Sequence, residues 1–135
     1  MSQALDYAPP TDRRPSRLLA LSANATLLYP LFLVGALYGQ WLVSWCVLGH
    51  APVPSIDDPK DVAGARWMNP ITALALVGWM PAACAAPVLN AVYVFARRFR
   101  GARLAARVLL LLSLWAGMFA LLRRGPLDVV TWWFD

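Results

Sequence analysis

Glutamate is absent from this chain of 135 residues, and lysine, histidine and cysteine are scarce. Its seven acidic residues are all aspartates, and eleven of its twelve basic residues are arginines. The single histidine excludes bis-histidine haem ligation, and the HExxH and CxxC patterns typical of zinc sites are missing. Two cysteines cannot build a disulfide framework. Cys46 and Cys84 fall at different expected depths in the membrane, so they are not expected to form a disulfide with each other. We expect both to be buried free thiols. We also expect no cofactor.

Charge is also scarce, because only 14% of the residues are charged while 60% are hydrophobic. A soluble domain carries about a quarter charged residues. Each of the three longest apolar segments can cross a hydrocarbon core of roughly 30 Å at about 1.5 Å per residue. These segments are Leu27–Leu48, Ile71–Ala96 and Leu104–Leu122. The sequence therefore predicts an all-α integral membrane protein with three transmembrane helices.

The flanking segments complete the expected organisation. Residues 1–17 form a cytoplasmic arm without the apolar stretch and cleavage site of a signal peptide, so the first span is expected to stay as an anchor. Residues 18–124 form the membrane domain, with spans at about 25–48, 70–96 and 104–122. Residues 125–135 form an interfacial aromatic tail on the outer face.

Two short interfacial helices are expected beside the spans. Asp58 followed by Pro59 is typical of a helix start, and Asp61 would lie near the free N–H groups, which predicts a helix from Pro59 to about Arg66. Pro126 to Phe134 is expected to form the second. Trp132 and Trp133 in it suit headgroup depth and are predicted interfacial anchors.

The distribution of lysine and arginine predicts the orientation. The N-terminal arm and the second connection hold eight such residues, against four in the first connection and the tail. The positive-inside rule then places the N-terminus in the cytoplasm and the C-terminus outside. Arg97, Arg98 and Arg100 in the second connection are expected to anchor the helix ends at the lipid headgroups. Nucleic acid is not an expected partner, since no soluble basic face exists to bind it.

Small residues recur at helical spacing within two of the spans. Gly35 and Gly39 form a GxxxG pair in the first span, and a four-residue repeat runs along the second. The members of that repeat are Gly78, Ala82, Ala86 and Asn90. Small residues at this spacing let helix backbones approach closely. They predict packing between the first two spans, or alternatively a dimer or a docking face for a larger complex.

One cluster resembles a polar site. His50, Asp57, Asp58 and Asp61 lie in the first connection, and a histidine with carboxylates could bind a metal or transfer protons. Because Asp58 and Asp61 also suit helix capping, we expect neither a metal site nor a catalytic site. The alternative is a lipid-facing enzyme using these residues.

Transport is a further alternative. The spans contain no carboxylate, which carriers commonly use for ion relays. Three spans are also too few to enclose a pathway within one chain. A channel or carrier for a small solute would have to form as an oligomer, lined by Gln40 and Asn90.

A resemblance to known proteins rests on two stretches of the chain. They are Gly49-His50 through Asp57-Asp58-Pro59-Lys60, and Asp128 through Trp132-Trp133-Phe134-Asp135. The chain resembles small multi-spanning bacterial inner-membrane proteins of unassigned function. That resemblance implies a bacterial inner-membrane location and assigns no functional residue. The function expected from the sequence is non-enzymatic: an accessory or scaffold subunit that packs with other membrane proteins or with itself.

Overall fold

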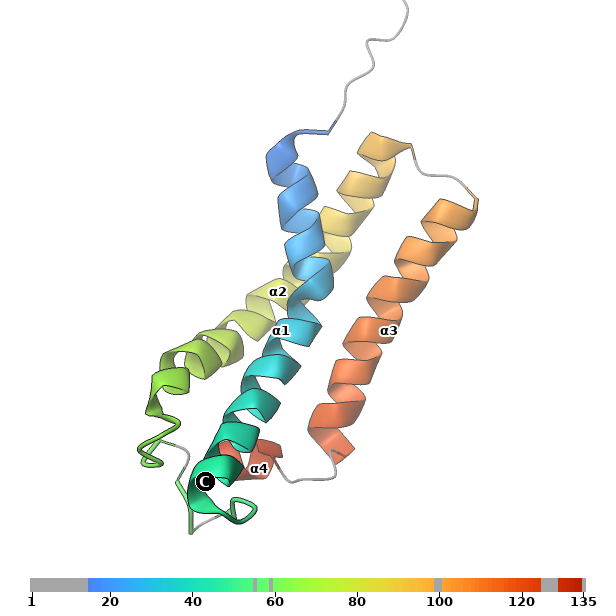
Figure 1. Ribbon diagram of the computed structural model, residues 1–135. Coiled ribbons are helices and arrows are strands. Elements are labelled where there is room, and N and C mark those ends of the chain that lie inside the picture. Colours follow the sequence, from blue (N-terminus) through green and yellow to red (C-terminus); the bar gives the residue numbers. More distant parts are fainter. Residues whose placement is uncertain (1–14, 55, 59, 99–100, 125–128, 135) are drawn as a thin grey trace, which may run out of the picture.

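The computed structural model describes residues 15–54, 56–58, 60–98, 101–124 and 129–134, and this part of the chain is helical without strands. Its elements are α1 (Arg17–Leu48), the 3₁₀ helix η1 (Arg66–Met68), α2 (Asn69–Arg97), α3 (Ala102–Arg124) and α4 (Val129–Phe134). Three of these helices are long and apolar enough to cross a membrane, as the sequence predicted. They run alternately in opposite directions, and α4 lies beside the end of α1 (Figure 1).

Local signals explain where α1 begins and ends. The Ser16 hydroxyl accepts a hydrogen bond of 3.2 Å from the Leu19 N–H, which caps the first turn. Gly49 ends the helix at a φ of 75°, a conformation that glycine adopts without steric cost. The 32 residues between them span about 48 Å at 1.5 Å per residue, more than a hydrocarbon core requires.

Helix α2 changes direction near its middle, as Figure 1 shows. Pro81 and Pro87 lie inside it. Each proline lacks an N–H group, and its ring crowds the carbonyl four residues earlier, which bends the helix. The positions of these prolines in the sequence are therefore enough to indicate the bend.

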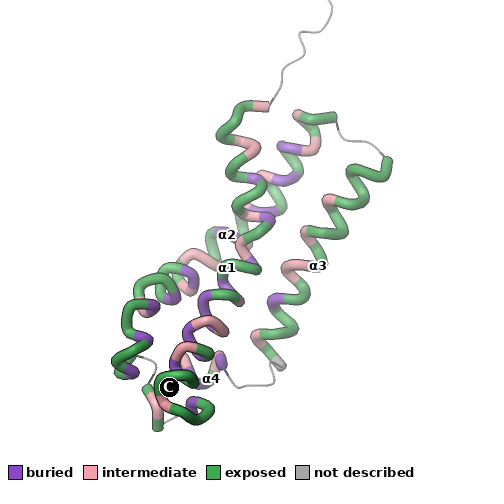
Figure 2. The backbone as a smooth tube through the Cα atoms, viewed as in Figure 1, coloured by how far each residue is buried: buried purple, intermediate pink, exposed green. Residues whose placement is uncertain are grey.

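The core lies mainly between α1, α2 and α4. Figure 2 shows buried positions along the facing sides of α1 and α2 and on α4, whereas α3 is mostly exposed. Only 6% of the apolar stretch of α3 is buried, against 22% in each of the other two long helices. The core cluster consists of Leu33, Ala36, Leu37, Trp41, Ala75, Met118, Val129 and Trp132.

The connection between α1 and α2 differs from its prediction. Residues 60–65 form hydrogen-bonded turns that lead into η1, instead of the expected helix from Pro59, which itself lies outside the described residues. The Asp58 carboxylate accepts the Lys60 N–H at 2.8 Å and closes a local turn. Such local bonding by aspartate competes with helix formation.

The two cysteines also differ from their prediction, because Cys46 and Cys84 are both exposed free thiols. Each long helix turns only one stripe toward the core, and these cysteines lie on the other sides. Burial was expected from their depth in the spans, which does not specify the direction in which a side chain points.

Candidate functional site

A buried amide joins three elements at the end of the molecule formed by residues 49–68 and α4, which we call the loop end. Gln40 of α1 is fully buried, and its Nε2 donates to Asn69 Oδ1 at 2.6 Å. The Trp133 indole donates to Gln40 Oε1 at 2.9 Å. Asn69 is the first residue of α2, and its bond to Gln40 links that helix to α1. Gln40 therefore has a structural role in holding α1, α2 and α4 together.

The tail tryptophans differ from the lipid anchors expected of them. Trp132 is fully buried in the core, and its indole N–H donates to the Asp57 carbonyl. Trp133 is half-buried and bonded to Gln40. A buried indole N–H needs an acceptor, and both find one within the protein. These residues fasten α4 to the rest of the fold; Pro126, where the tail helix was expected to begin, lies outside the described residues.

The histidine and acids of the first connection do not form one cluster. His50 Nδ1 lies 3.8 Å from Asp57 Oδ2, and that carboxylate also accepts the Val53 N–H at 2.9 Å. Asp58 closes its own turn, while Asp61 lies 3.7 Å from Arg66 on the exposed surface. Among the described residues, no group of three or more potential ligands could hold a metal ion.

The small-residue repeat of α2 lies against α1. Three members of the repeat are buried: Ala82, Ala86 and Asn90. At the fourth, the Tyr29 hydroxyl occupies the space that a side chain on Gly78 would need. This hydroxyl donates a hydrogen bond of 2.7 Å to the Ala75 carbonyl. The two glycines of α1 differ from one another. A Cβ on Gly39 would lie 3.3 Å from the Met68 methyl group, whereas one on Gly35 would meet nothing within 4 Å.

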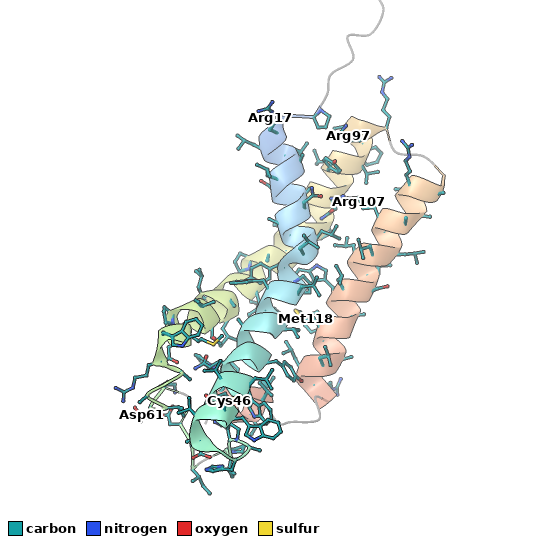
Figure 3. All side chains as sticks on the ribbon, viewed as in Figure 1. Arg17, Cys46, Asp61, Arg97, Arg107 and Met118 are labelled. Carbon is teal, nitrogen blue, oxygen red and sulfur yellow. The ribbon has the colours of Figure 1, made fainter. Side chains whose placement is uncertain are left out.

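The opposite end of the molecule, which we call the arginine end, gathers basic residues from three helices. Arg17 and Arg97 lie at this end, with Arg107 slightly further along the bundle (Figure 3). Arg98 directly follows the last residue of α2, and Arg103 lies in the first turn of α3. Arg100 was expected beside them and lies outside the described residues.

The partners of Arg107 among the described residues are all neutral groups. Its Nε donates to Asn90 Oδ1 and its Nη2 to Asn24 Oδ1, both at 3.0 Å. The guanidinium carbon lies 4.5 Å from the centre of the Tyr93 ring, which favours a cation–π contact. This arrangement was not predicted from the sequence. The available signal was an arginine one turn inside an apolar helix.

Arg107 and Arg98 both line a groove of about 580 Å³ between α2 and α3. Arg98 ends α2 at a φ of 52°, in the left-handed region that a residue with a side chain seldom adopts. Asn90 is the third polar residue of the lining. The remaining lining residues are Pro87, Ala91, Val94, Phe95, Leu104, Val108 and Leu111. The groove thus combines an apolar wall with two guanidinium groups.

Comparison of the chain with known protein families, curated proteins and solved structures gives no match.

Proposed function

We propose that the protein is an integral membrane accessory subunit that associates through α3 with another membrane protein or with a second copy of itself. The proposed location is the bacterial inner membrane, which the resemblance implies, with the arginine end in the cytoplasm, the orientation that the charge distribution favours. All the described acids, Asp57, Asp58 and Asp61, lie at the loop end. That end, with the C-terminal helix, would then face outward.

The observation that carries this proposal is the side of α3 turned away from the rest of the chain. Ser113, Ala116, Gly117 and Ala120 are exposed there, and we call them the small-residue face. Successive helical residues turn by about 100°, which places this face opposite the side that carries Trp115, Met118 and Leu122. The latter three residues belong to the core cluster or pack against it.

Small residues on an exposed side have a specific consequence in lipid. They let the backbone of a second helix approach closely, and this packing replaces the hydrophobic driving force that is lacking between helices in a bilayer. A Cβ on Gly117 would meet nothing within 4 Å, so the surface there is open. Because α3 is the least buried of the three long helices, it has the most surface left for a partner.

The test replaces small residues on this face with leucine. We expect Gly117→Leu and Ala120→Leu to weaken association by about tenfold or more, which corresponds to roughly 1.4 kcal/mol. The control is Ala73→Leu, which adds a leucine to an exposed position of α2 near the same end of the molecule. Native mass measurement in mild detergent, with identification of co-purifying proteins, reports the association. Unchanged assembly in both α3 variants would refute the proposal.

The alternative functions receive less support from the geometry. Gln40 and Asn90, the residues expected to line a pore, are both buried and hydrogen-bonded within the chain. Replacing either one would therefore disturb the fold as well as any conduction. Among the described acidic residues, only Asp57 has its carboxylate within 4 Å of His50, and that carboxylate already accepts a hydrogen bond from the loop backbone.

A further inference from the structure

The arginine end has positive charge without a described counterion. Both ion pairs among the described residues, His50–Asp57 and Arg66–Asp61, lie at the loop end. Arg107 has two neutral amide oxygens and one aromatic ring as its partners. These contacts orient the guanidinium but do not neutralise it, and they use only two of its five N–H donors. An anion beside this group would therefore gain charge-assisted hydrogen bonds.

The groove next to Arg107 is unsuited to a small anion alone. Apart from Asn90, Arg98 and Arg107, the residues that line it are apolar. Inorganic phosphate would satisfy the arginines and leave that wall uncovered. A volume of about 580 Å³ lies within the range of roughly 300–1,000 Å³ typical of small-molecule sites.

An occupant that matches both parts has a negative headgroup and an apolar chain. We propose that the α2–α3 groove binds one anionic phospholipid, with the phosphate at Arg98 and Arg107 and an acyl chain along the wall formed by Val94, Val108 and Leu111. This rests on the membrane location in the proposed function. Basic pockets between membrane helices on the cytoplasmic side favour such headgroups.

Arg98 and Arg107 would have different roles in binding the headgroup. Arg107 is held in place by Asn24, Asn90 and Tyr93, so its guanidinium is oriented before a lipid arrives. Arg98 lies on the turn after α2, and its side chain is exposed. It can therefore close over a headgroup from the aqueous side. A zwitterionic lipid would bring its own cation to this site and gain less.

The test is a titration of the full chain in mild detergent, followed by native mass spectrometry. The probes are phosphatidylglycerol and phosphatidylcholine with identical acyl chains. We expect phosphatidylglycerol to bind more tightly, and Arg98→Gln to weaken that binding by about tenfold. Arg103→Gln is the matched control, since it removes the same charge from an exposed residue near the start of α3 that is outside the groove lining.

A second pair of variants tests the apolar wall. Val94→Trp fills the groove and is expected to weaken phosphatidylglycerol binding to a similar extent. Val92→Trp places the same side chain on the exposed surface of α2, outside the groove lining, and is expected to leave binding unchanged. Because Arg98 and Val94 take no part in the small-residue face, association through α3 is expected to persist in both variants.

Three results would overturn the lipid assignment. The first is equal binding of the two lipids, or equal effects of Arg98→Gln and Arg103→Gln. The second is displacement of phosphatidylglycerol by inorganic phosphate, which would indicate a free-phosphate site. The third is loss of self-association in Val94→Trp, which would indicate that a second copy occupies the groove. Loss of association in Gly117→Leu with lipid binding intact would support both proposals. The proposed function is tested by association, and the lipid assignment is tested by lipid binding, so the failure of one is distinguishable from the failure of the other.

Discussion

At the scale of single residues, identical amino acids have different roles that depend on the direction in which they point. Gly78 leaves room for the Tyr29 hydroxyl, which bonds to the Ala75 carbonyl of the same helix. Gly35 faces open space. Both glycines belong to patterns of small residues at four-residue spacing, and the two patterns look equivalent in the sequence. Only the packing of α1 on α2 distinguishes the two glycines.

Gly78→Ala is therefore expected to lower the free energy of unfolding by about 1–3 kcal/mol, because the new methyl group would overlap Tyr29. Gly35→Ala is expected to be neutral or stabilising by up to about 1 kcal/mol, since alanine favours helix and meets no neighbour. Tryptophan fluorescence during denaturation in detergent provides the measurement. In a Tyr29→Phe background, which removes the nearest contacting atom, the cost of Gly78→Ala should shrink. An equal cost in both backgrounds would contradict the assigned contact.

At the scale of elements, the short helix α4 contributes more to the core than its length indicates. Val129 and Trp132 are buried, and two indole N–H groups connect α4 to the first connection and to α1. An amphipathic tail at a membrane surface was the expectation from the aromatic composition. The structure instead places one of these rings inside the protein, where it closes the loop end.

Trp132→Ala is expected to destabilise the protein by about 3–5 kcal/mol, the usual cost of removing a large buried side chain. Phe134→Ala is the matched control, because Phe134 belongs to the same helix and is 68% exposed. Its cost is expected to stay below about 1 kcal/mol. Thermal unfolding, together with proteolysis of the segment 49–68, measures both variants. Similar losses in the two would mean that α4 does not pack as the structure shows.

At the scale of the whole molecule, charge divides the protein into two unlike ends. The arginine end has basic groups from three helices, whereas the described acids and the only histidine lie at the loop end. Helices running alternately in opposite directions produce this separation, because the two connections then lie at opposite ends (Figure 1). The positive-inside rule converts the separation into a prediction of orientation.

That orientation can be measured with single cysteines in a Cys46→Ala, Cys84→Ala background. His50→Cys at the loop end is expected to react with a membrane-impermeant maleimide in intact bacterial cells. Arg103→Cys at the arginine end is expected to react only after permeabilisation. Both native side chains are exposed, so access is limited by the membrane and not by the fold. The reverse labelling pattern would mean an inverted topology.

The three long apolar helices and the bend of α2 can be read directly from the order of the amino acids. Hydropathy, helix length and proline placement act over neighbouring residues, so a linear reading captures them. The sequence also shows Asn90 and Arg107 as polar residues within apolar segments, without indicating that they meet. It predicted a helix after Asp58, where local turns form.

Which of these residues meet follows from the packing of the helices and could not be read from their order in the chain. Asn24 and Arg107 are 83 positions apart, and Gln40 and Trp133 are 93 positions apart. Their pairing depends on how the helices rotate about their own axes, and that rotation follows from the fit of side chains across an interface. Helical periodicity identifies which residues share one side of a helix, but it does not specify which other helix that side contacts. The α2–α3 groove, the buried Trp132 and the open face of α3 therefore follow from packing.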